Sequence, residues 1–220
     1  MFRSRGWWIL ALVGLVCTGA TLADTVVAYN NFGPGNNGFE VYLGWSWMLA
    51  APGSGFDPVQ NAQWFTPSTG GPLSDIYIGL RKVIPPYRNV FVRLCADNGF
   101  APPTEADILE QWLVDTAPLA FAGVGQAPPV RLVSVLQPVL DAGRPYVIWV
   151  GLNESGGSAA WQPNIYDELA PRRQRTYPYG VWTWQALDYS RAGALRVDVV
   201  PEPASLAVLL LGLLPVARRR

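Results

Sequence analysis

Apolar and polar residues alternate with a period of two over much of this chain. Successive side chains of a strand point to opposite faces, so this period is typical of strands that bury one face. The clearest run places Val41, Trp45 and Leu49 on a common face. By this pattern the predicted strands are 25–30, 41–49, 62–66, 74–82, 89–96, 130–136, 145–152, 181–186 and 194–200.

Glycine, proline and asparagine residues close most of these runs and indicate turns. About nine short strands with such links predict an all-β fold, an antiparallel β-sandwich of the jelly-roll type. The Pro85-Pro86 turn predicts that 74–82 and 89–96 pair as a hairpin. The body, residues 24–199, holds about 176 residues, which is the size of one domain with a full core.

One segment departs from the alternation. Thr104 is followed three residues later by Asp107, which is the spacing of a helix cap, and the apolar residues of 108–113 recur at helical spacing. The pattern predicts a short helical turn here, with passage into a strand as the alternative.

The first 23 residues have the composition of a secretory signal peptide. Arg3 and Arg5 precede an apolar stretch at 6–17, and the segment 21–23 (TLA) supplies the small residues of a cleavage site. We therefore expect residues 1–23 to be removed and the rest of the chain to be exported.

The last 21 residues combine three features in a fixed order. A hexapeptide with two prolines comes first, an apolar stretch at 206–217 follows, and an arginine cluster closes the chain. The prolines favour an extended segment, the apolar stretch predicts a short membrane helix, and arginines stay on the cytoplasmic side. The hexapeptide is Val200, Pro201, Glu202, Pro203, Ala204 and Ser205, and the cluster is Arg218, Arg219 and Arg220.

This tail, residues 200–220, resembles the PEP-CTERM sorting tail of exported bacterial proteins. The resemblance implies that an exosortase recognises the tail in the inner membrane and removes it. The partners that it implies are the exosortase and the export machinery, with exopolysaccharide as a candidate. The product is then expected in the cell envelope, at the surface or in the extracellular matrix.

The body resembles the choice-of-anchor R type of exported domain over roughly residues 29–199. Such domains usually have an Asp-Asn-Gly-Gly-x-Pro-Gly turn where this chain has DNGFAPP at 97–103. The family has no established chemistry, so the resemblance implies location and fold and leaves the ligand open. The matching segments are YNNFGPGNN at 29–37, GWSW at 44–47, FTPSTGGPLSDIYIGL at 65–80, LCADNGFAPP at 94–103 and GRPYVIWV at 143–150.

Removal of both ends changes the charge and the cysteine count. Five of the 16 basic residues leave with the ends, so the mature net charge is about −5. An acidic body argues against nucleic acid and against an anionic membrane surface as partners. Cys17 leaves with the signal peptide, and Cys95 alone cannot form an intramolecular disulfide.

The chain contains no histidine, which excludes the Ser-His-Asp and Cys-His arrangements and most zinc sites. We therefore expect Cys95 to be a packed thiol, and we predict no catalytic residue, metal or cofactor. The segment 97–99 (DNG) is expected to be a turn and not part of a calcium site. Arg172, Arg173 and Arg175 are expected in a solvated loop, with acidic polysaccharide as a possible ligand.

The segment 105–110 (EADILE) resembles the Glu-x-Asp-x-x-Glu motif of jelly-roll endoglucanases. In that motif a strand and a bulge bring the outer two carboxylates onto one face, as nucleophile and acid/base. In a helical turn Glu105 and Glu110 instead lie about 140° apart and diverge. The segment is therefore predicted to be a capped, solvated turn.

Most of the tryptophans that remain after signal removal are expected in the core, Trp149 among them, because they lie in alternating runs. Trp161 follows a Gly-Gly-Ser sequence in a polar loop and is expected to be exposed. Trp182 and Trp184 are two residues apart and share one strand face. The candidates for stacking on a sugar ring are Trp161, Trp182 and Trp184, with core packing as the alternative.

Three functions from different classes fit these patterns. The first is a structural or adhesive protein of the envelope or matrix, without enzyme activity. The second is a carbohydrate-binding module, which requires exposed tryptophans. The third is a jelly-roll glycoside hydrolase, which requires that Glu105 and Glu110 face one cleft.

Overall fold

The computed structural model describes residues 24–32, 47–121, 128–152, 154–163 and 168–201. The predicted signal peptide at 1–23, the sorting tail from residue 202 onward and most of the predicted strand 41–49 lie outside these residues. No helix within the described ranges is long and apolar enough to cross a membrane. The membrane helix expected at 206–217 lies outside them.

The described residues are almost entirely strands and loops, with two 3-10 turns and no α-helix. Every strand pair among them is antiparallel, so the all-β prediction is confirmed. The elements are β1 (Val26–Asn30), β2 (Trp47–Ala50), β3 (Val59–Phe65), β4 (Gly71–Ile78), β5 (Leu80–Ile84), β6 (Val90–Ala96), η1 (Glu105–Asp107), β7 (Ile108–Val114), β8 (Val130–Val133), β9 (Val139–Leu140), β10 (Tyr146–Leu152), β11 (Ser158–Trp161), β12 (Leu169–Thr176), η2 (Pro178–Gly180), β13 (Thr183–Trp184), β14 (Asp188–Arg191) and β15 (Leu195–Val199).

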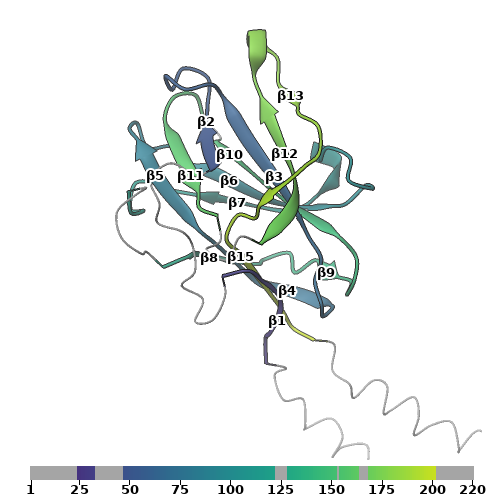
Figure 1. Ribbon diagram of the computed structural model, residues 1–220. Coiled ribbons are helices and arrows are strands. Elements are labelled where there is room, and N and C mark those ends of the chain that lie inside the picture. The colour runs from purple at the N-terminus through teal and green to yellow at the C-terminus, as the bar shows by residue number, and fades with distance from the viewer. Residues whose placement is uncertain (1–23, 33–46, 122–127, 153, 164–167, 202–220) are drawn as a thin grey trace, which may run out of the picture.

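The strands form two sheets (Figure 1). The smaller sheet has the order β1-β15-β4-β8, and β9 pairs with β4. The larger sheet has the order β5-β11-β2-β3-β10-β6-β7. Strand β12 extends it from β3, and β13 and β14 both pair with β12.

One hydrophobic core joins the two sheets. The smaller sheet contributes residues such as Ile76 and Val197, and the larger sheet contributes Val92 and Ile148, all of them fully buried. Each such side chain stabilises the fold by about 1.5–3 kcal/mol through burial of apolar surface. The period-two alternation therefore identified the inner face of strands such as β6 correctly.

A second apolar cluster covers the opposite face of the larger sheet. Phe91, Cys95 and Trp149 belong to it, and Trp184 and Leu187 pack against it from the β13–β14 segment. As a result β3 and β10 are buried along their whole length on both faces. Strand β10 is accordingly a continuous apolar run, because neither of its faces needs polar residues.

The predicted hairpin between 74–82 and 89–96 is wrong. The first run ends at Gly79, which separates β4 in the smaller sheet from β5 in the larger sheet. The Gly79 amide donates to the Ala194 carbonyl (3.1 Å), and the Gly79 carbonyl accepts from the Gln162 amide (2.8 Å). Strand β5 pairs with β11, whereas β6 pairs with β10 and β7.

The predicted capping residues are correct, and the short helical turn passes directly into a strand. Thr104 and Asp107 form a capping box around the single turn η1. Residues 108–114 are strand β7, paired with β6. The register shifts between Leu94 and Cys95 of β6, so that Leu109 of β7 has no partner and forms a bulge. Because the bulge adds one residue to β7, the apolar residues of this strand do not follow strict alternation, and their spacing resembles that of a helix.

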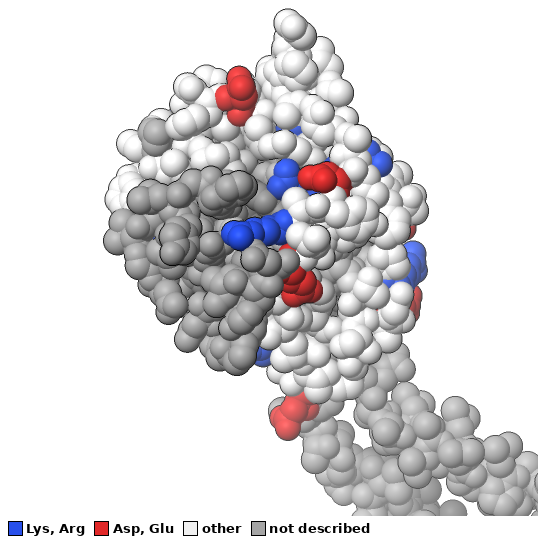
Figure 2. Space-filling model, viewed as in Figure 1, with Lys and Arg blue, Asp and Glu red and all other residues white. Residues whose placement is uncertain are grey.

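The two ends of the body lie together, and a hairpin arm projects from the opposite end (Figure 1). Val26 of β1 pairs with Val199 of β15, so both termini leave from the same sheet. The arm consists of β12, η2 and β13. Its segment 177–187 contains no charged residue, and the tip is uncharged at the top of Figure 2.

The expectation that Trp161 is exposed is wrong. The preceding Gly156 and Gly157 adopt positive φ and form a tight turn, after which β11 enters the larger sheet between β2 and β5. Trp161 is 0% exposed, and its indole N–H donates to the Ala194 carbonyl (3.2 Å). Gly193 lies against the ring, since a Cβ there would come within 2.3 Å of it.

We expect Trp161→Ala to lower the free energy of unfolding by about 3–5 kcal/mol, because it removes a fully buried indole. Gly193→Ala should also destabilise the protein by displacing the ring. Urea unfolding followed by tryptophan fluorescence measures both effects. Leu136→Ala, at a side chain 69% exposed, is the control and should change little. Equal midpoints for Trp161→Ala and the wild type would contradict the buried position.

Candidate functional site

A cleft of about 350 Å³ lies on the face of the larger sheet away from the main core. The alternation of β6 turns Val92 into the core and Arg93 outward, where Arg93 is the cross-strand partner of Trp149. The arm contributes Arg175 and Trp182 to the cleft wall. The site thus combines two cations with aromatic rings from β10 and the arm.

The Arg93 side chain is fixed by two aromatic rings and by two hydrogen-bond acceptors. Its guanidinium carbon lies 4.3 Å from the centre of the Phe91 ring and 4.5 Å from that of Trp149. Its nitrogens donate to Gln111 (2.6 Å) and to the Glu105 carboxylate (2.8 Å). The charge of Arg93 is therefore balanced within the fold.

Arg175 lies among three tryptophans, with its guanidinium carbon 5.5 Å from the Trp149 and Trp182 rings and 5.6 Å from Trp184. Its Nη1 donates at 3.5 Å to Gln60, and its buried Nε–H has no hydrogen-bond partner. No carboxylate of the described residues forms an ion pair with it. Burial is the main cause that lowers the pKa of Arg175.

Trp182 and Trp184 share one side of the arm, as predicted, because both rings face Arg175. Trp184 packs edge-on against Trp149 (5.7 Å between ring centres), and Trp182 packs against Tyr177 (5.1 Å). Both tryptophans are half-buried. Trp182 lines the cleft, whereas Trp184 mainly closes the apolar cluster below it.

The three arginines expected in a loop lie in strand β12, so that expectation is wrong. Arg172, Arg173 and Arg175 pair with residues of β3 and are half-buried. Arg173 donates to the backbone carbonyls of Phe100 (3.2 Å) and Gln185 (3.0 Å). Strand β12 escapes sequence prediction because it contains a proline and no apolar alternation.

Glu105 and Glu110 lie on opposite faces of the larger sheet. Glu105 is exposed beside Arg93, whereas Glu110 pairs with the core residue Leu94 and is buried. Glu110 accepts hydrogen bonds from the Ser134 hydroxyl (2.6 Å) and from the amides of residues 135 and 136 (2.7 and 3.2 Å). The two carboxylates diverge because of this strand geometry, and not because of a helix.

The segment 97–99 forms the predicted turn. The Asp97 carboxylate accepts from the amides of Gly99 (3.1 Å) and Phe100 (2.9 Å) and from the indole N–H of Trp64 (2.6 Å). Within the described residues, no group of three Cys, Asp or Glu side chains is placed to hold a metal ion.

The thiol of Cys95 is fully buried, as predicted for a packed residue. Burial is the main cause that raises its pKa to about 12. Its burial and this raised pKa favour the protonated thiol at neutral pH, which is the less reactive form.

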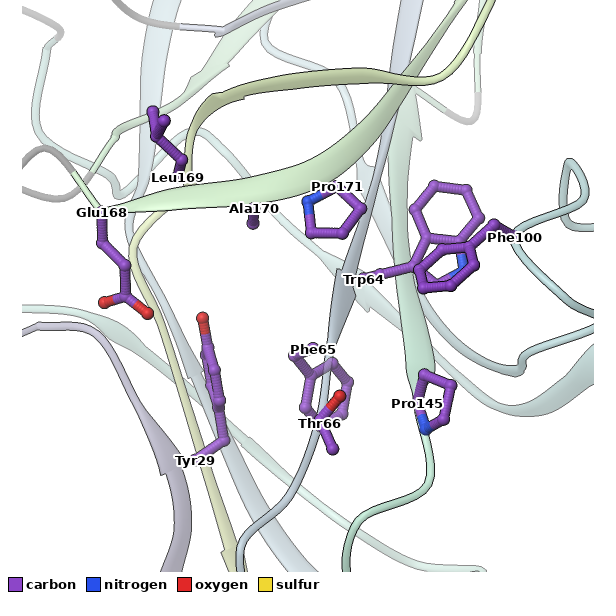
Figure 3. A pocket seen from close by; sticks show the side chains of 10 residues that line it. All are labelled: Tyr29, Trp64, Phe65, Thr66, Phe100, Pro145, Glu168, Leu169, Ala170 and Pro171. Carbon is purple, nitrogen blue, oxygen red and sulfur yellow. The ribbon is translucent and has the colours of Figure 1, made fainter.

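A second pocket, of about 240 Å³, opens between β1, the end of β3 and the start of β12 (Figure 3). The Tyr29 hydroxyl points toward the Glu168 carboxylate, and the Trp64 and Phe100 rings pack against each other at a tilt at the other end (5.9 Å between ring centres). Burial raises the pKa of Glu168 and, together with that carboxylate, the pKa of Tyr29. No sequence pattern indicated this pocket, because its lining residues come from distant segments.

Comparisons with family models, with curated proteins and with solved structures found no match for this chain.

We expect Glu110→Ala to lower the free energy of unfolding by about 2–3 kcal/mol, because three donors lose a charged acceptor. Glu105→Ala should cost less, about 1 kcal/mol, because the Glu105 side chain is 71% exposed and water screens its ion pair. Urea unfolding at neutral pH measures both. Similar midpoints for the two variants would contradict the assignment of the two carboxylates to opposite faces.

Proposed function

We propose that this chain is an exported protein of the cell envelope or exopolysaccharide matrix, where it has a structural or adhesive role. In this proposal residues 1–23 are a signal peptide and residues 200–220 a PEP-CTERM tail that an exosortase removes. The observation that carries the proposal is the ordered tail itself, with its hexapeptide, apolar stretch and arginines. It begins directly after the last strand, since β15 ends at Val199.

The finer fold that we propose for the body is a jelly-roll β-sandwich. Two antiparallel sheets that share one core support it. The paired ends of β1 and β15 are compatible with attachment to a membrane at one end of the body. The arm, which forms part of the cleft wall, lies away from that end, where it would meet the surroundings (Figure 1).

The proposed role does not include catalysis. The carboxylates of Glu105 and Glu110 lie on opposite sheet faces, so they do not form the pair that a glycosidase needs. The hydrolase hypothesis is the weakest of the three for this reason. Carbohydrate binding is the second candidate, and the cleft beside Arg175 and Trp182 favours it, whereas the buried Trp161 does not contribute.

The mature protein is expected to begin near Asp24 and to lack Arg218 to Arg220, after cleavage within 201–205. Mass spectrometry of the protein isolated from the cell surface or matrix of the native host measures both ends. The same chain from a strain without exosortase serves as the control and should keep its tail. An intact C-terminus on the mature surface form would refute exosortase processing.

The purified protein should release no reducing ends from β-glucans or from the exopolysaccharide of its host. The reason is the separation of the two carboxylates described above. A reducing-sugar assay of the wild type measures this, with Glu105→Gln and Glu110→Gln as comparisons. Turnover that both substitutions abolish would favour the endoglucanase hypothesis instead.

A further inference from the structure

We propose that the cleft beside Arg175 binds an acidic sugar, with the carboxylate of a uronic acid unit on the guanidinium and the sugar ring against Trp182. The inference rests on the proposed function, because it gives the adhesive body its ligand class. It uses the cleft formed by the larger sheet and the arm.

The charges around the cleft leave one cation without a counter-ion. Arg93 pairs with Glu105 (2.8 Å), and Glu154 pairs with Arg88 outside the cleft wall (3.0 Å). Arg175 forms no ion pair with a described residue, and its Nε–H is buried without an acceptor. A half-buried cation without an ion pair is costly, and an anionic ligand on the side of the guanidinium that lines the cleft would supply the missing counter-charge.

The ligand group that reaches Arg175 carries one negative charge and not two. Glu105 and Glu154 both line the cleft, and their carboxylates disfavour a doubly charged group at the guanidinium. The charge of Glu105 acts on Arg175 and by itself would raise the pKa of Arg175. Burial lowers that pKa by more, so the net shift is downward. A sugar carboxylate on Arg175 fits this field better than a phosphate dianion, because it places a single charge at the guanidinium.

The remaining walls suit a ring with hydroxyl groups. Trp182 is half-buried and presents an aromatic surface to the cleft, on which the C–H groups of a pyranose can stack. Gln60, Ser155 and the two carboxylates supply hydrogen-bonding partners for hydroxyls. An aromatic acid without hydroxyls would leave those carboxylates against apolar surface. The volume of about 350 Å³ accommodates one or two sugar rings.

Isothermal titration calorimetry on the full-length chain in mild detergent tests the proposal. The probes are hexagalacturonate as the acidic oligomer, cellohexaose as a neutral one, and inorganic phosphate. We expect binding of hexagalacturonate alone, with an affinity that falls as salt rises. Arg175→Gln and Trp182→Ala should each weaken that binding at least about tenfold.

Two further variants separate the cleft from general charge effects. Arg144→Gln removes the same charge from an exposed arginine on the β9–β10 loop and should leave the affinity unchanged. Arg175→Lys keeps the charge without the planar fork and should bind with intermediate affinity. Thermal melting of each variant verifies that it is folded.

Several results would overturn the proposal. They are equal binding of cellohexaose, preferential binding of phosphate, equal weakening by Arg144→Gln and Arg175→Gln, and no binding of hexagalacturonate by the folded wild type. None of them affects the processed ends seen by mass spectrometry, so failure of the ligand assignment is distinguishable from failure of the sorting proposal.

Discussion

The structure depends on the burial of one apolar face of each sheet against the other. Cys95 is a free thiol, so no disulfide supports the described residues. Fully buried aliphatic side chains from β4 and β15 meet those of β6 and β10 instead. Because this contact fixes the inner faces of the strands, it also decides which residues turn outward. The position of Arg93 in the cleft is a consequence of the burial of Val92 beside it.

The outward face of the larger sheet is unusual in being apolar as well. The arm covers part of it through Trp184, and the rest is closed by stacked rings and guanidinium groups. Arginine suits this environment because its flat, weakly hydrated cation packs against aromatic faces. The same packing leaves Arg175 without an ion pair to a described carboxylate. Arg175 thus packs against three tryptophan rings and, at the same site, has no counter-ion among the described residues.

The sequence predicted the fold class and most strands whose inner face is marked by alternating apolar residues, such as 90–96 and 195–199. It failed where tertiary pairing changes the local pattern. The bulge at Leu109 gave β7 the spacing of a helix, and the polar turn before Trp161 concealed a core strand. Strand β12 has no hydrophobic pattern at all. Of the candidate site, Trp182 and Trp184 were predicted, whereas the isolation of Arg175 depends on contacts between distant strands.

The place of β15 has a consequence for the order of folding. This strand is the last in the described chain, yet it lies between β1 and β4 in the smaller sheet. The contacts of β1 with the sheet thus span nearly the whole body, which gives the fold a high contact order. The smaller sheet stays open until Leu195–Val199 emerge, so its part of the core cannot close before the last described strand is available to pair. The last step in forming the smaller sheet is therefore the pairing of Leu195–Val199, which directly precede residue 200.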